Sequence, residues 1–95
     1  MFEPNEFEWD AAKAASNLRK HGLAFNEAVL AFEDARRVEQ DVSRPEDRES
    51  RLKVVARVHN RLVIVVFAVW GDVCRIISAR RPNPKEERAY DYRSI

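Results

Sequence analysis

Apolar residues in the second half of the chain follow a pattern that predicts three neighbouring β-strands. The strands cover residues 51–58, 62–70 and 73–80, and valine, isoleucine and phenylalanine dominate them. The short gaps between them, at His59-Asn60 and Gly71-Asp72, suit two-residue hairpin turns. The middle strand is apolar on both of its faces, which predicts a central position in an antiparallel sheet.

The first half of the chain predicts two helices. Residues 11–21 carry apolar side chains on one stripe and are bounded by Asp10 as N-cap and Gly22 as C-terminal stop. The other stripe of this helix is polar and holds Lys13, Asn17, Lys20 and His21. A second helix is expected over residues 27–33, with Asn26 as its N-cap.

Weaker patterns complete the predicted fold. Residues 7–9 and 36–42 favour short strands, and residues 84–92 favour a short C-terminal helix. That helix is expected to begin at the motif formed by Asn83, Pro84 and Glu86. The whole pattern predicts one α+β domain over residues 1–95. Its two N-terminal helices pack on one face of a mainly antiparallel four- to five-stranded sheet, and the short C-terminal helix follows.

The hairpin turns also predict which side chains share a face of the sheet, because directly paired residues point to the same side. Pairing Val54 with Val65 gives an apolar face that the N-terminal helices are expected to cover. The same register pairs Val65 with Ser78 and so places Arg80 on the core side. Trp9 is also expected in the core.

The opposite face of the sheet combines an apolar floor with a basic rim. Its cations are Arg51, Lys53, Arg57, Arg75 and Arg81. Such a face could bind nucleic acid, since cations neutralise phosphates while flat side chains meet bases. It could equally be an exposed face with solubilising charges, or the C-terminal helix could hide its floor.

Composition narrows the class of protein. Of the 95 residues, 45% are hydrophobic and 35% are charged, which is typical of a globular protein with a charged surface. One cysteine, Cys74, excludes an internal disulfide and a multi-cysteine zinc site, and two glycines exclude a glycine-rich phosphate loop. The sequence shows no secretory leader and no apolar run long enough to span a bilayer, so we expect a cytoplasmic protein.

The net charge of +1 hides an asymmetry between the two halves of the chain. Residues 1–43 hold five basic against nine acidic side chains, whereas residues 44–95 hold twelve basic against seven acidic ones. A basic second half indicates a polyanionic partner, although a charged stretch is more often a solvated surface.

Four residues have side chains with candidate chemistry. His21 could act as a general acid or base, or it could be a cation that favours the end of its helix. Arg80 and Arg81 could bind phosphate oxygens, or they could pair with Glu86 or Glu87. Tyr90 could offer its phenol to a site or anchor the C-terminal helix. Two distant histidines without a cysteine pair predict no metal site, and no cofactor is predicted.

Two stretches of the chain are similar to the opening and closing signatures of BrnT-type toxins. The first comprises Phe7-Glu8-Trp9-Asp10, Lys13, Asn17, Lys20-His21-Gly22, Phe25, Glu27-Ala28 and Phe32. The second comprises Arg75-Ile76-Ile77-Ser78-Ala79-Arg80, Lys85-Glu86-Glu87-Arg88 and Tyr90. Both stand in the right order and at the right separation, and the poor match is confined to residues 34–50. The chain also departs from many relatives at Ala56, where they carry glycine, and at Trp70, where they carry a basic residue.

The resemblance implies a RelE-like ribonuclease toxin of a type II toxin–antitoxin system. It implies neutralisation by a BrnA-type antitoxin with a DNA-binding segment, repression of the shared operon, and a heterotetramer of two toxins and two antitoxins. The family fold uses one side of the sheet for helices and the other for RNA, in agreement with the two faces inferred above. RelE-like enzymes cleave RNA without metal: the ribose 2′-hydroxyl attacks the adjacent phosphate and the 5′-hydroxyl leaves.

Carried over by position, the candidate catalytic residues are Arg80, His21, Lys20 and Tyr90. Arg80 would stabilise charge on the phosphate, His21 or Lys20 would transfer a proton, and Tyr90 is a further candidate for proton transfer. The candidate RNA-binding residues are Lys53, Arg57, Arg75, Arg81 and Ser78. Two alternatives stay open, namely a non-catalytic module that binds nucleic acid or protein, and an inactive relative kept for repression.

Overall fold

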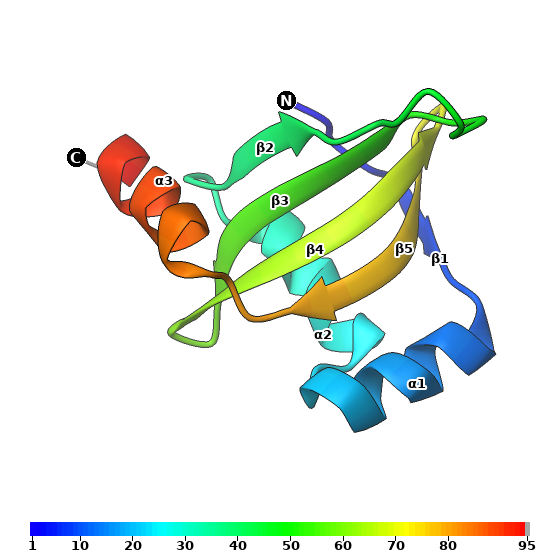
Figure 1. Ribbon diagram of the computed structural model, residues 1–95, viewed down its shortest axis with the longest axis horizontal. Coiled ribbons are helices and arrows are strands. Elements are labelled where there is room, and N and C mark those ends of the chain that lie inside the picture. Colours follow the sequence, from blue (N-terminus) through cyan, green and yellow to red (C-terminus); the bar gives the residue numbers. More distant parts are fainter. Residues whose placement is uncertain (95) are drawn as a thin grey trace.

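A mixed sheet of five strands runs through the molecule, in the order β1-β5-β4-β3-β2 (Figure 1). The computed structural model describes residues 1–94. The strands are β1 (Glu6–Glu8), β2 (Val38–Asp41), β3 (Arg51–Val58), β4 (Arg61–Trp70) and β5 (Val73–Arg80). Strands β2 to β5 pair antiparallel, and β1 joins the outer edge of β5 in parallel. The predicted α+β class is confirmed, and β4 is central, as its two apolar faces require.

Two tight turns set the register of the central strands. His59 and Asn60 between β3 and β4 both have positive φ angles, of 50° and 65°, and Gly71 between β4 and β5 has a φ of 60°. Left-handed backbone at these positions matches the twist of the flanking strands, and asparagine and glycine adopt it readily. The predicted pairing of Val54 with Val65 is confirmed.

The helices are α1 (Ala11–His21), α2 (Phe25–Ala28) and α3 (Pro84–Ser94), with a 3₁₀ helix over Val29–Glu33. Asp10 caps α1, because its Oδ1 accepts hydrogen bonds from the backbone nitrogens of Ala12 at 2.8 Å and Lys13 at 3.0 Å. Gly22 ends the helix in the left-handed conformation, with a φ of 70°. Both ends of α1 therefore lie where the sequence predicts them.

The second helix differs from its prediction. It begins at Phe25, directly after Ala24, so Asn26 lies inside the helix and is not its N-cap. Phe25 is 2% exposed, and its place in the core starts the helix earlier than the capping pattern suggests. The prediction that Trp9 lies in the core is wrong: Trp9 is 38% exposed and meets Phe25 edge-on, with ring centroids 6.0 Å apart.

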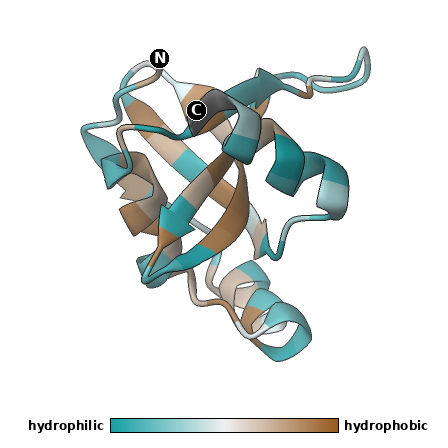
Figure 2. Ribbon diagram, turned by 90° about the vertical axis from the view of Figure 1, so that its left-hand side faces the viewer, coloured by the Kyte–Doolittle hydropathy of each residue, from teal (hydrophilic) through white to brown (hydrophobic). Residues whose placement is uncertain are grey.

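The main core lies between one face of the sheet and the α2–3₁₀ segment. Phe67 on β4 stacks on Phe2, with centroids 5.7 Å apart, and meets Phe32 edge-on at 5.0 Å. In Figure 2 the segment over this face is mainly in the hydrophobic colours, whereas α3 is mainly hydrophilic. Burial of each large apolar side chain contributes about 1.5–3 kcal/mol, so this layer holds the sheet and the helices together.

Strand β5 contains one extra residue that the predicted register lacks. Pairing follows the prediction up to Ile76, but Val65 then pairs with Ala79, and not with Ser78. A register shift at this point leaves Ile77 without a direct partner on β4. The predicted pairing of Val65 with Ser78 is therefore wrong.

This β-bulge decides which side chains β5 presents to each face. Ala79 faces the main core. Arg80 pairs with Ile64 and lies, together with Ser78, on the opposite side of the sheet, which we call the second face. A shift of one residue exchanges the two faces of a strand, and a bulge introduces such a shift. The prediction that Arg80 lies on the core side is wrong for this reason.

Helix α3 covers part of the second face. Its Tyr90 packs in a small cluster with Val55 and Ile64, and partly buried neighbours surround them. The alternative in which the C-terminal helix hides the apolar floor is thus correct for the end of the face next to β2 and β3. The part formed by β5, around Ser78, adjoins α1 instead.

Candidate nucleic-acid interface

A basic groove lies between α1 and the second half of β5. Its lining residues are Lys13, Ser16, Asn17, Lys20, His21, Ile77 and Ser78, and its volume is about 270 Å³. The polar stripe of α1 thus meets the residue that the β-bulge turns toward it. The structure brings together three of the predicted site residues, Lys20, His21 and Ser78, from opposite ends of the sequence.

Asn17 fastens α1 to β5 along the floor of this groove. Its Nδ2 donates to the backbone oxygens of Leu23, at 2.9 Å, and Ala79, at 2.8 Å, while its Oδ1 accepts from the Ala79 nitrogen at 3.0 Å. The amide therefore satisfies the outer edge of β5 beyond the end of β1, as a neighbouring strand would. Asn17 is only 6% exposed, and it sets how far the basic end of α1 stands from the strand.

Replacing Asn17 by alanine should destabilise the fold by about 2–4 kcal/mol, because buried backbone groups of Ala79 and Leu23 lose their partners. The urea midpoint of unfolding measures this loss. Ser16→Ala changes an exposed neighbour in the same groove and should leave the midpoint within the error of wild type. Equal midpoints for the two variants would contradict the role given to Asn17.

Arg80 is held by Glu86, the first acidic residue of α3. Its two terminal nitrogens donate to the two carboxylate oxygens at 2.9 and 2.8 Å, and Lys53 Nζ donates to the same carboxylate at 2.9 Å. Glu86 also accepts from the Asn83 backbone nitrogen, and the Asn83 side chain accepts from the Glu86 nitrogen, which forms the predicted helix start. Of the alternatives for Arg80, pairing with a nearby glutamate is the one present.

This pairing orients Arg80 without using all of its donors. The guanidinium makes two hydrogen bonds to Glu86 and one to the backbone oxygen of Arg81, and its side chain is 34% exposed. A guanidinium has five N–H groups, so within the described part of the chain two remain for a further anion. The hydrogen bonds from Arg80, with those from Asn83 and Lys53, lower the pKa of Glu86 to about 2. The same pairing raises the pKa of Arg80.

The depressed pKa of Glu86 predicts a loss of stability in acid. The charged carboxylate stabilises the folded state fully above the unfolded value of about 4.5, and this contribution disappears as the pH falls toward 2. In Glu86→Gln this group cannot titrate, so the unfolding free energy should decrease by about 3 kcal/mol less between neutral pH and pH 2 than it does in wild type. Urea unfolding at a series of pH values measures it. Glu87→Gln changes the next residue, which is exposed, and its unfolding free energy should fall with decreasing pH as steeply as that of wild type. If the unfolding free energy of Glu86→Gln also falls as steeply as that of wild type, Glu86 is not the source of the acid sensitivity.

Tyr90 anchors α3 and lies apart from the α1–β5 groove. Its side chain is buried at 3% exposure, and its hydroxyl donates to Asp34 Oδ2 at 2.8 Å. The Arg57 guanidinium stands over the ring, 5.6 Å from its centroid, and the Arg57 backbone nitrogen donates to the same Asp34 oxygen at 2.8 Å. Burial, followed by the bond to Asp34, raises the pKa of the Tyr90 phenol. The structure thus does not bring Tyr90 together with His21.

A second hollow lies at the end of the sheet next to the β3-β4 turn. Arg57, Arg61 and Arg81 line it, and its volume is about 370 Å³. Arg57 and Arg81, which are predicted RNA-binding residues, therefore lie beside Arg61, which the sequence did not single out. Arg75 lies elsewhere on β5, exposed beside Ala68 and Glu8.

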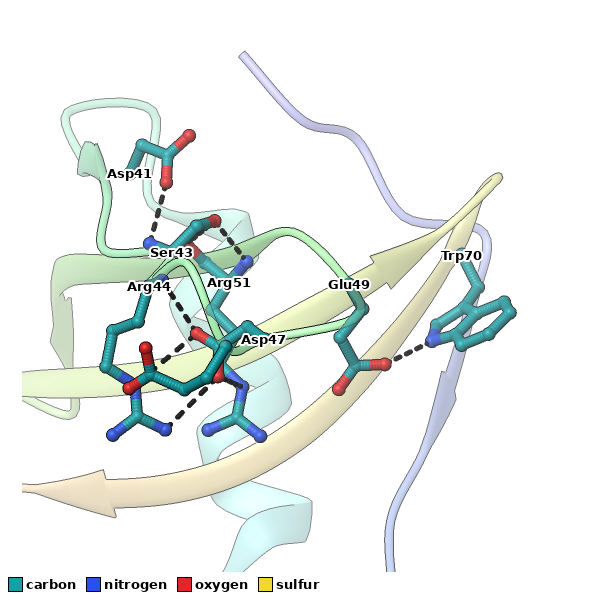
Figure 3. A network of polar contacts seen from close by, with 8 residues as sticks. Asp41, Ser43, Arg44, Asp47, Glu49, Arg51 and Trp70 are labelled. Atoms are coloured by element: carbon teal, nitrogen blue, oxygen red, sulfur yellow. Dashed lines mark hydrogen bonds and ion pairs between the residues drawn. The ribbon is translucent and has the colours of Figure 1, made fainter.

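Arg51, the remaining predicted cation of the second face, interacts with the loop between β2 and β3 (Figure 3). Asp47 accepts from Arg44 at 3.1 Å and lies 3.7 Å from Arg51 Nε. Glu49 Oε2 accepts from the Trp70 indole nitrogen at 2.8 Å. The charge of Arg51 is thereby compensated by a carboxylate at the end of the sheet far from the β3-β4 turn. Arg51 lines neither the α1–β5 groove nor the second hollow.

Asn17, Asp34 and Arg61 have roles that the sequence did not assign. Asn17 belongs to the polar stripe of α1 and to the family signature, so its position carried a signal. The sequence indicated Glu86 as part of a helix start and as one of two possible partners of Arg80, and the structure shows it in both roles. No local pattern distinguishes Asp34 or Arg61 from other charged residues.

The described residues contain neither a candidate metal-binding cluster nor a helix that could span a membrane. Over residues 1–94 no three His, Cys, Asp or Glu side chains gather as a set that could hold a metal ion. No helix in that range has the length and apolarity to cross a membrane.

Comparison with known proteins supplies the family. A model of the family described as the ribonuclease toxin BrnT of type II toxin–antitoxin systems matches residues 9–86. No curated protein matches the chain. The match covers α1, β5 and Glu86, and so includes the α1–β5 groove and the partner of Arg80. The resemblance drawn from the two signatures is confirmed, and the chain belongs to the BrnT family of ribonuclease toxins of type II toxin–antitoxin systems.

Proposed function

We propose that this BrnT protein is an endoribonuclease that cleaves RNA in the α1–β5 groove without a metal ion. The observation that carries the proposal is the meeting of Lys20, His21 and Ser78 in one basic groove. Arg80 follows Ser78 by two residues on the same face of β5, about 7 Å along the strand. A scissile phosphate above Ser78 would therefore lie within reach of a proton-transfer group and a guanidinium.

The reaction needs a base, an acid and a stabiliser of negative charge. A base removes the proton of the ribose 2′-hydroxyl, and the oxygen attacks the adjacent phosphorus. The bond to the 5′-oxygen breaks, and an acid protonates that oxygen, which leaves as a 5′-hydroxyl beside a 2′,3′-cyclic phosphate. His21 and Lys20 take the two proton-transfer roles, and Arg80 stabilises the charge of the pentacovalent phosphorane. Since Tyr90 is buried against Asp34, we assign it the support of α3 and Arg57.

The RNA strand on either side of the cut is bound by cations of the second face. These are Lys53, Arg57, Arg75 and Arg81, with the Ser78 hydroxyl at the centre. Lys53 shares Glu86 with Arg80, so it acts chiefly by compensating that carboxylate and leaving Arg80 free to turn its remaining donors to the phosphate. Phosphate contacts of this kind give affinity that falls with salt.

The family also supports a protein partner. A type II toxin has an antitoxin, and we propose one of the BrnA type, which assembles two-plus-two with this chain, represses the operon and acts in the cytoplasm. An acidic antitoxin segment over the basic grooves would exclude RNA directly. Competition between RNA and the product of the neighbouring small gene tests this arrangement.

Incubation of the purified protein with RNA in EDTA tests the proposed reaction. We expect cleavage with 2′,3′-cyclic phosphate and 5′-hydroxyl ends. A gel shift with intact RNA would instead support the second candidate, a non-catalytic nucleic-acid-binding module, which the three arginines that line the second hollow favour. If the protein neither cleaves nor binds RNA, both candidate functions are refuted.

A further inference from the structure

The second hollow forms where the chain leaves the sheet after β5. The last pair between β4 and β5 joins Ile64 to Arg80, so residues 61–63 of β4 have no partner on β5. Arg81 and Pro82 turn away from the sheet and leave an opening beside this strand end. The hollow therefore results from unequal strand lengths. Five segments place side chains around it, namely β3, β4, α3 and the connections α1–α2 and β5–α3.

Its rim is basic and its floor is apolar. Arg57, Arg61 and Arg81 stand against a single carboxylate, Glu87, while Leu23, Leu62, Val63 and Pro82 line the rest. Within the described residues none of the three guanidinium groups has a carboxylate oxygen within 4.0 Å, in contrast to those of Arg37, Arg44, Arg51 and Arg80. The Arg57 guanidinium lies over the Tyr90 ring and interacts electrostatically with Asp34. Three guanidinium groups that line one hollow attract an anion, the more so because those of Arg61 and Arg81 have no ion-pair partner among the described residues. Arginine binds phosphate oxygens in a bidentate manner.

The hollow directly adjoins the α1–β5 groove. Asn17 lines the groove and donates to the backbone of Leu23, which lines the hollow. Ser78 in the groove and Arg81 in the hollow are three residues apart, so their Cα atoms lie at most about 11 Å from each other. An RNA strand bound in the α1–β5 groove and continuing into the second hollow would place the nucleotide next to the scissile phosphate at the three arginines.

We propose that the three-arginine hollow is a second RNA subsite, which binds the phosphate and base of a nucleotide next to the one that is cut. The guanidiniums hold the phosphate, and the base lies on the apolar floor or stacks on a guanidinium plane. A volume of about 370 Å³ is within the range of small-ligand pockets. This subsite rests on the proposed ribonuclease function and adds Arg61 to its substrate contacts.

Arg61 is the residue to test, because it lies outside the catalytic groove and is exposed. Fluorescence anisotropy with a 2′-O-methyl dodecamer, which cannot be cut, measures affinity at several salt concentrations. We expect Arg61→Ala to weaken binding about tenfold and Arg61→Glu to weaken it more. The slope of log affinity against log salt should become shallower by about 0.7, the value for one lost phosphate contact on a single strand. With cleavable RNA, KM should rise at unchanged kcat.

Arg48→Ala is the matched control, since Arg48 is an exposed arginine in the loop at the other end of the sheet. Circular dichroism checks that all variants are folded. If wild type cleaves RNA but Arg61→Ala and Arg61→Glu bind it like Arg48→Ala, the subsite is refuted and the ribonuclease proposal stands. If wild type neither binds nor cleaves RNA, the proposed function itself fails. Loss of antitoxin binding with unchanged RNA affinity would also overturn the subsite and make the hollow a protein-docking site.

Discussion

Arg80→Ala should lower the rate of RNA cleavage by about a hundredfold or more, and cells that express it without antitoxin should grow normally. Arg80 is the cation that combines an oriented guanidinium with a place on the same face as Ser78. Its bidentate pairing with Glu86 fixes it before substrate arrives, so charge on the phosphorane meets a group that need not reorganise. Single-turnover cleavage of a labelled RNA measures the loss, and growth after induction gives the cellular result.

Two further variants separate chemistry from folding and from charge. Arg80→Lys keeps the positive charge but loses the fork that spans Glu86 and the phosphate, so most of the activity should still be lost. Arg75→Ala removes an exposed arginine from the same strand and should weaken RNA binding without a comparable loss of rate. Since Arg80→Ala leaves Glu86 with Lys53 and Asn83 as partners, its melting curve must show a folded protein at the assay temperature. Growth arrest by a folded Arg80→Ala protein would refute the assignment.

His21→Ala should lower the cleavage rate by about 10²–10⁴-fold, the usual cost of removing a general acid or base. His21 ends α1 and lines the groove beside Lys20 and Ser78, so it can reach a phosphate bound there. In wild type the rate should depend on the protonation of one histidine, and the corresponding limb of the pH–rate profile should disappear in the variant. A profile is informative because a merely structural role would not change its shape.

His59→Ala is the control, because it removes the only other histidine of the chain. His59 lies at the β3-β4 turn, 4.0 Å from Glu27, and its removal should leave the rate and the pH profile as they are. A wild-type rate for His21→Ala would show that His21 serves only as a cation at the end of its helix, where it interacts favourably with the helix dipole.

The proposed RNA site and the position of α3 are linked through Glu86. Its carboxylate holds Arg80 and Lys53 on the sheet and at the same time caps α3 through Asn83. The helix is held a second time by Tyr90 and Asp34. These two attachments explain why a helix of low hydropathy stays on the second face: polar pairs as well as a small apolar cluster fix it there.

Most of the local structure of this protein follows from its sequence. Caps at Asp10 and Gly22 fix α1, the turn residues His59-Asn60 and Gly71-Asp72 fix the hairpins, and the apolar run of β4 fixes the order of the central strands. Each of these signals acts over a few residues, where backbone preferences and apolar periodicity are strong. The family signatures in the sequence indicate the ribonuclease class and single out Lys20, His21, Ser78 and Arg80 as candidates for function.

Tertiary structure decided what the local patterns could not. The β-bulge at Ile77 moves Ser78 and Arg80 together from the core side to the second face of the sheet, and Asn17 of α1 is bonded to β5 just beyond it. Arg37 is buried at 3% exposure because Glu3 and the Phe2 backbone reach it from more than thirty residues away. Contacts at such separations leave no periodic trace in the sequence. The sequence alone therefore determined the elements and the family, whereas long-range packing and charge pairing determined which cations lie on each face of the sheet.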